Sequence, residues 1–205
     1  MSSNNHPKRR GESAEFALSQ EQVQKVLSAC ADLEQRVTIG LQLFLGLRAS
    51  EACHFNSAWI TEEGDVKIPP SQACNCAECA RTRSRVWKPK TKAGARTLPI
   101  PERMRKDIAE LLRVKPYGLD ISRVGFYYRT KTILSRAGIK LKGGYSEAFP
   151  HALRATCFNL LIEGGISAPG LAYFAGWSNI AIASHYITLT RAKSLALREA
   201  RAIFG

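Results

Sequence analysis

The sequence predicts an α+β domain that is mostly helical and carries a small antiparallel sheet of three strands. Apolar residues recur at helical spacing through most of the 205 residues. Three short runs of β-forming residues, at 66–68, 85–88 and 96–100, are crowded together in the middle of the chain. Apolar residues make up 45% of the chain and charged residues 23%. A chain of this length and composition can bury a core without disulfide bonds.

In the first third of the chain, residues 1–14 are polar and basic without periodicity, which predicts a disordered arm. Residues 15–205 are expected to form one domain. Ser19 and Gln22 have the spacing of a capping box and open the first predicted helix. The apolar residues from 33 to 54 fit one longer, continuous helix with a buried stripe. Residues 66–68 form the first predicted strand, which Pro69 and Pro70 end.

The remaining elements follow a polar, cysteine-bearing loop. Residues 85–88 and 96–100 flank Lys92, Ala93 and Gly94, which predicts a β-hairpin. Further on, helices are expected at 102–114, 122–137, 150–162, 171–174 and 180–189, followed by a basic helix at the end of the chain.

The charge indicates a polyanionic partner. Lys and Arg number 30 against 17 Asp and Glu, a net charge of +13. Residues 81–106 hold ten basic residues and one acidic residue, and residues 129–142 hold five cations and no carboxylate. Two such stretches favour nucleic acid. An apolar run of membrane-spanning length and the apolar segment of a signal peptide are both missing, so a cytoplasmic, DNA-associated protein is expected and no membrane partner.

Cys74, Cys76 and Cys79 form a CxCxxC motif in the polar loop, which predicts a structural Zn²⁺ site. The fourth ligand would be His54 or Cys53. Reduced thiols without a metal are the alternative interpretation. In a cytosolic protein the six cysteines are thiols or metal ligands rather than a disulfide framework.

The chain contains no P-loop, GxGxxG, HExxH or GxSxG motif. A set of weaker motifs is notable for its order and spacing. These are GLRASE with Arg48 and Glu51, Lys90 in the hairpin, HxxR with His151 and Arg154, Trp177 after a glycine, and Tyr186. Together they resemble the tyrosine recombinases, or phage-type integrases, over residues 15–205. The 23-residue step from Arg154 to Trp177 and the nine-residue step to Tyr186 agree with that family.

The resemblance implies a reaction. Tyr186 would attack a DNA phosphodiester and form a 3′-phosphotyrosine, which needs neither ATP nor a metal cofactor. Arg48 and Arg154 would hold the non-bridging phosphate oxygens. Lys90 would protonate the leaving 5′ oxygen, with Lys92 as the alternative general acid.

The other motif residues would assist. His151 would accept the tyrosine proton or donate to the phosphate. Trp177 has only an indole N–H and can therefore only donate. Glu51 would orient Arg48 or His151.

Three features depart from the family pattern. Trp177 stands where many relatives have His, and Ala155 stands where His is common. Relatives usually carry an N-terminal helical domain, and only about 14 residues precede the catalytic domain here. The expectation is therefore a fragment or a short recombinase.

The expected partner is double-stranded DNA. The resemblance implies a virus, plasmid or mobile-element integrase that is a homo-tetramer on recombination sites and a monomer off DNA. Two other functions stay open: a DNA-binding accessory protein, such as a truncated integrase, and a relaxing enzyme of the type IB topoisomerase kind.

Overall fold

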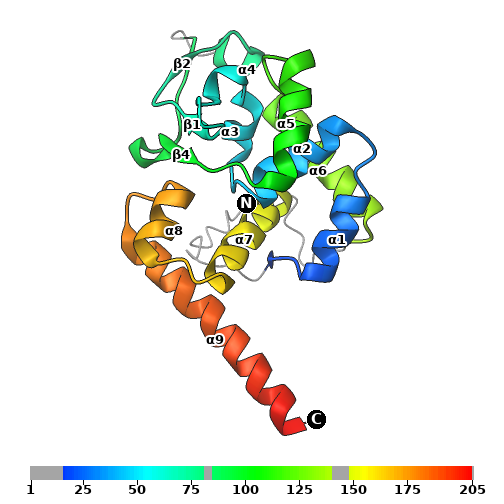
Figure 1. The fold of residues 1–205 in the computed structure, drawn as a ribbon, viewed down its shortest axis with the longest axis vertical. Coiled ribbons are helices and arrows are strands. Elements are labelled where there is room, and N and C mark those ends of the chain that lie inside the picture. Colours follow the sequence, from blue (N-terminus) through cyan, green and yellow to red (C-terminus); the bar gives the residue numbers. More distant parts are fainter. Residues whose placement is uncertain (1–15, 81–84, 140–147, 205) are drawn as a thin grey trace, which may run out of the picture.

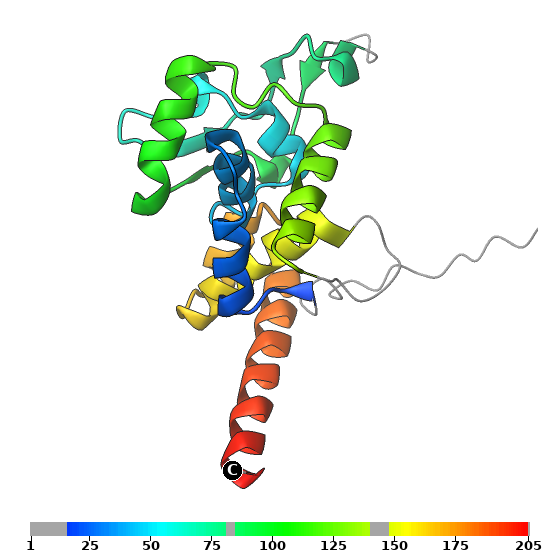
Figure 2. The ribbon, with the colours of Figure 1, turned by 90° about the vertical axis from the view of Figure 1, so that its right-hand side faces the viewer.

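The computed structural model describes residues 16–80, 85–139 and 148–204, so the predicted arm at 1–14 lies outside the described residues. They form a helix-rich body from which the C-terminal part of the last helix projects (Figures 1 and 2). The helices and strands are α1 (Gln20–Ser28), α2 (Leu33–Leu43), α3 (Ala49–His54), β1 (Val66–Ile68), β2 (Gln72–Ala73), α4 (Ala77–Ala80), β3 (Val86–Trp87), β4 (Arg96–Leu98), α5 (Glu102–Val114), α6 (Arg123–Arg136), α7 (Ala148–Glu163), α8 (Ala168–Ala175) and α9 (Ile180–Phe204). The predicted mostly helical α+β fold is confirmed.

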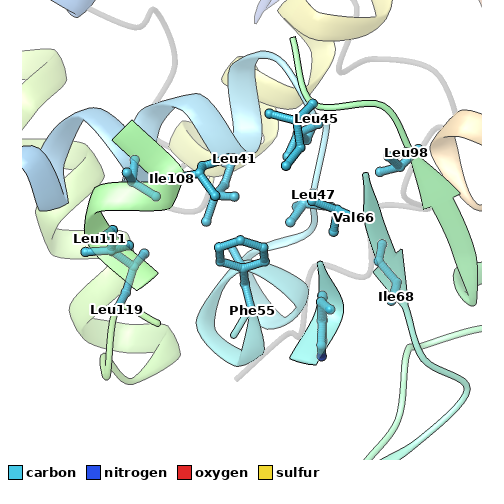
Figure 3. Packing of buried hydrophobic residues seen from close by; sticks show 14 of the residues in the cluster. Leu41, Leu45, Leu47, Phe55, Val66, Ile68, Leu98, Ile108, Leu111 and Leu119 are labelled. Atoms are coloured by element: carbon cyan, nitrogen blue, oxygen red, sulfur yellow. The ribbon is translucent and has the colours of Figure 1, made fainter. Parts of the chain in front are cut away.

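Helix α2 lies at the centre and packs against α5, α6 and α7. Its neighbours bury a core in which Phe55 is surrounded by aliphatic side chains from α2, α5 and the β1–β4 pair (Figure 3). Each fully buried side chain of this size contributes roughly 1.5–3 kcal/mol to folding. The predicted capping box at the start of α1 is present, since Ser19 and Gln22 each accept a hydrogen bond from the other's backbone N–H.

The expected continuous helix over 33–54 is wrong, because the chain breaks between α2 and α3. Gly46 has φ +55°, a left-handed conformation that a helix cannot include. A Cβ at this position would lie 3.0 Å from the ring of Phe158 and 3.3 Å from Cys157 Sγ. Arg48 then has extended backbone (φ −68°, ψ 151°) and occupies the N-cap position of α3. The break therefore directs Arg48 away from a helix surface and into the interior.

The strands pair differently from the expected hairpin. β1 pairs antiparallel with β4, and β2 pairs antiparallel with β3, so the described strands form two small sheets. Strand β2 was not predicted, because two residues are too few to show alternation. Between β3 and β4 the chain makes a 3₁₀ turn at Lys92–Gly94 instead of a tight hairpin turn. We call residues 88–95 the lysine loop.

The last two predicted helical segments are one helix, α9, of 25 residues. Helix α8 ends at Gly176, whose φ of +64° terminates it. Both α7 and α8 pack against the N-terminal part of α9. Among the described helices none is long and apolar enough to span a bilayer.

Gly46→Ala should destabilise the fold more than Gly138→Ala does. Gly138 also has a left-handed φ, of +69°, but a Cβ there would meet nothing within 4 Å. Backbone strain alone should therefore cost about 1 kcal/mol at Gly138. At Gly46 crowding against Phe158 should add about 1–3 kcal/mol. Urea denaturation measures the free energy of unfolding of both variants. Equal losses of stability would show that the side chains around Gly46 rearrange without an energetic cost.

Candidate active site

The N-terminus of α3 carries a buried ionic cluster centred on Glu51, which is 1% exposed. Arg48 donates to Glu51 twice, from its backbone N–H (2.9 Å) and from Nη1 (2.7 Å). Arg96, from β4, donates to the same carboxylate from Nη1 (3.3 Å) and Nη2 (3.1 Å). Burial alone would raise the pKa of Glu51, but the charges of Arg96 and Arg48 outweigh it and hold that pKa below its ordinary value.

Arg154 reaches the same cluster from α7. Its Nη1 donates to the carbonyl of Gly46 and its Nη2 to the carbonyl of Ala175, so the two turns that end α2 and α8 both hold it. Its guanidinium lies over the ring of Phe158, 4.7 Å from the centroid. Burial, followed by repulsion from Arg48, lowers the pKa of Arg154 to about 9. It is therefore still cationic at neutral pH, in a place that favours an added negative charge.

Gly176 connects the cluster to the lysine loop. Its carbonyl accepts from Arg48 Nη2 (3.1 Å) and from Thr91 Oγ1 (3.1 Å). A Cβ at this position would lie 3.0 Å from Arg96 Nη1 and 3.1 Å from the Ala93 carbonyl, which explains why glycine fits here. The contact fixes the lysine loop beside the arginines.

Lys90 and Lys92 are both exposed, one on each side of Thr91. The structure therefore places both lysine candidates on the same anchored loop and does not distinguish them by burial.

Tyr186 lies on the N-terminal part of α9 and is 3% exposed. Its ring contacts Phe158 edge-on (centroids 6.0 Å apart) and Trp177 (5.9 Å). Trp177 in turn packs against Phe158 (5.2 Å). Because Arg154 covers the same Phe158 ring, these three aromatic side chains adjoin the arginine cluster.

A cavity of about 420 Å³ opens beside the arginines. His151, which is exposed, lines it together with Arg48 and Arg154, and residues of α6 such as Tyr128 form another part of the wall. Lys90, Trp177 and Tyr186 are not among its lining residues. The structure thus brings Arg48, Glu51, Arg154 and His151 together directly, with Trp177 and Tyr186 adjoining them through Phe158.

Comparison with known proteins identifies the family and supports the fold. Residues 17–193 match the model of the phage integrase family. The chain belongs to that family. The fold is similar to the crystal structure of XerA recombinase (TM-score 0.65, 14% identity, 89% of this chain and 62% of that one).

Two further structures are similar. One is the Tn1549 transposon integrase in complex with circular intermediate DNA (TM-score 0.63, 19% identity, 88% of this chain and 66% of that one). The other is the catalytic domain of bacteriophage HP1 integrase (TM-score 0.58, 21% identity, 83% and 85%). The chain spans just under two thirds of the XerA and Tn1549 structures, and no curated protein sequence matches it.

Arg96 is a member of the cluster that sequence reasoning missed. Residues two apart in a strand share a face, so the apolar Leu98 places Arg96 on the buried face of β4. Arg96 is indeed only 4% exposed. A buried arginine needs acceptors for its N–H groups, so the alternation was the available signal that Arg96 has partners in the interior, although it does not identify Glu51.

The predicted cysteine ligands also come together. Cys74, Cys76 and Cys79 surround the side chain of His54, at the other end of α3 from Arg48. Of the two candidates for a fourth ligand, His54 is the one in the group, and Cys53 is not.

Glu51→Gln should destabilise this integrase-family chain by about 3–5 kcal/mol at neutral pH, because it leaves the buried arginines without their counter-charge. Since the pKa of Glu51 is lowered in the folded state, its stabilisation is complete above about pH 4.3 and is lost as pH falls through the lowered value. The gap between wild type and variant should therefore shrink in acid. Urea denaturation at several pH values measures it.

Glu102→Gln is the matched control, because Glu102 forms an ion pair with Arg105 but is 93% exposed. Its stability should stay close to that of the wild type. A Glu51→Gln variant as stable as this control would contradict a charge-balancing role for Glu51.

Proposed function

We propose that this chain is the catalytic domain of a site-specific tyrosine recombinase that cleaves and rejoins DNA through a 3′-phosphotyrosine. The observation that carries the proposal is the buried cluster of three arginines and one carboxylate, with a tyrosine beside it in the aromatic group of Phe158. The Tn1549 integrase, which shares the fold, was captured in complex with DNA.

The arginine cluster suits a phosphate. Arg48, Arg96 and Arg154 carry three positive charges against the one negative charge of Glu51, so the group is short of anions. A guanidinium has five N–H donors, and the hydrogen bonds of Arg154 to two backbone carbonyls do not use them all. Arg48 and Arg154 both line the cavity, where a phosphodiester would meet them. They stabilise the two negative charges of the five-coordinate transition state.

Tyr186 is the nucleophile of the proposal. Its hydroxyl oxygen forms a bond to phosphorus while the bond from phosphorus to the 5′ oxygen breaks, so the phosphoryl group is transferred without net hydrolysis. His151 accepts the phenolic proton or donates to the phosphate. Because Tyr186 is buried against Phe158 and Trp177, the hydroxyl reaches a phosphate in the cavity only if the start of α9 shifts when DNA binds.

The lysine loop supplies the general acid. Lys90 donates its proton to the leaving 5′ oxygen, and Lys92, two residues on, is the alternative. The hydrogen bond from Thr91 to Gly176 anchors the loop that carries both lysines next to the arginine cluster. Glu51 positions Arg48, and Trp177 donates its indole N–H. The reaction requires no metal or nucleotide, and we propose a homo-tetramer on double-stranded sites.

Tyr186→Phe should retain DNA binding and lose all covalent complex, because only the nucleophilic oxygen is removed. The assay uses nicked suicide substrates and denaturing gels. Tyr117→Phe is the matched control: Tyr117 lies between α5 and α6, is 85% exposed and does not line the cavity, so the covalent complex should stay intact. Covalent product from Tyr186→Phe would identify a different nucleophile.

The same assay separates the alternatives. A DNA-binding accessory protein gives no covalent complex, and a topoisomerase gives one on any duplex. The proposed recombinase gives one only on particular sites.

DNA affinity should fall with salt with a log–log slope of about −4 to −7, from five to eight phosphate contacts at about −0.9 each. Arg96 is buried and Arg129 is paired with Glu34, so the exposed lysine loop supplies a main part of the contact surface. Replacing both Lys88 and Lys92 with Gln should make the slope about two units less steep.

Lys25→Gln on α1 is the control, since Lys25 is paired with Glu21 on the same helix, and the slope should not change. Fluorescence anisotropy from 50 to 200 mM salt measures each slope. An unchanged slope in the double variant would place the DNA elsewhere on the molecule.

A further inference from the structure

A group of four metal-ligating side chains lies at the C-terminal end of α3, apart from the arginine cluster. The ligand atoms of His54, Cys74, Cys76 and Cys79 all lie within 4.8 Å of one another. His54 Nε2 is 3.5 Å from Cys76 Sγ and 3.4 Å from Cys79 Sγ. We infer that these four residues form a structural Zn²⁺ site, and this inference does not rest on the proposed recombinase activity.

The spacing fits tetrahedral coordination. Zn–S bonds of about 2.3 Å and Zn–N bonds of about 2.0 Å place neighbouring ligand atoms about 3.5–3.8 Å apart. The two distances from His54 Nε2 already have about this value. The remaining separations need to close by only about 1 Å when an ion binds.

The histidine is oriented for this role. Its Nδ1 lies 2.7 Å from the carbonyl of Ser50, and because a carbonyl only accepts, Nδ1 must carry the proton. In the neutral imidazole, Nε2 then presents a lone pair to the thiols. The ring stacks on Trp87 (centroids 5.1 Å apart), and Trp87 Nε1 donates to Ser50 Oγ (2.9 Å). Such outer contacts fix the ring of a metal-binding histidine.

The ligand chemistry selects the ion. Three thiols and one imidazole favour Zn²⁺ over Mg²⁺ or Ca²⁺, which prefer oxygen. Four protein ligands complete a tetrahedron and leave no position for substrate, so the site is structural rather than catalytic.

The location indicates what the ion stabilises. Cys74, Cys76 and Cys79 lie in a short segment between β2 and β3, and of these cysteines only Cys79 is buried. The ion would link this segment to α3, whose first turn carries Glu51. Strand β3 leads directly into the lysine loop. The site therefore ties the base of that loop to the helix that holds Arg48.

Metal analysis of reduced protein purified without chelator tests the inference. The wild type should contain about one equivalent of Zn²⁺, and Cys76→Ser should contain less than about a tenth of one. Cys53→Ser is the matched control, because Cys53 adjoins His54 in the sequence but is outside the ligand group, and it should keep its zinc.

A second measurement does not depend on the variants folding. Refolding the wild type with Co²⁺ should give the intense visible bands of a tetrahedral, thiolate-bound ion, and added Zn²⁺ should abolish them. Less than about a tenth of an equivalent of zinc in the wild type, or zinc kept by Cys76→Ser, would overturn the site. A disulfide among these cysteines in the purified protein would also overturn it. None of these readouts involves DNA cleavage.

Discussion

Three guanidinium groups converge in the interior of this protein, and the carboxylate of Glu51 makes their convergence stable. Like charges repel strongly where water is excluded, so the cluster could not form without an anion at its centre. Glu51 also accepts the backbone N–H of Arg48, which fixes the first turn of α3. Through Arg96 the same carboxylate holds β4. A single buried charge thus ties together the break after α2, the start of α3 and one edge of the sheet.

Backbone carbonyls also accept hydrogen bonds from the arginines of the cluster. The turns at Gly46 and Ala175–Gly176 end α2 and α8, and each presents a carbonyl oxygen that accepts from an arginine. These oxygens carry partial negative charge, so they reduce the cost of burying the cations without neutralising them. Full neutralisation is left to a ligand. The cluster is therefore stable and still keeps a net positive charge, which suits the phosphate of the proposed substrate.

Local patterns in the sequence predicted most of the helices and the order of the motif residues, because periodicity and capping are properties of neighbouring residues. The errors occur where distant contacts decide. Gly46 lies inside an apolar run that reads as helix, and its left-handed turn is explained by Phe158 and Arg154, more than 100 positions away. The alternation along β4 places Arg96 inside, but its partner Glu51 lies 45 positions earlier, and no local pattern pairs the two. The burial of Tyr186 depends on packing that no motif encodes.

Helix α3 links the arginine cluster to the lysine loop, so the positions of these two parts of the site depend on each other. It has six residues, too few to be stable alone, and therefore relies on contacts at both ends. At its N-terminus Glu51 binds the arginines, and at its C-terminus His54 stacks on Trp87. Trp87 ends β3, directly before the lysine loop, which returns to the arginines through Thr91 and Gly176. These contacts form a closed ring from the arginine cluster through α3 to the lysine loop and back to the cluster. Displacing the loop would therefore strain the contacts at both ends of α3. The lysine loop and Arg48 are therefore held in one frame although about 40 positions separate them in the chain.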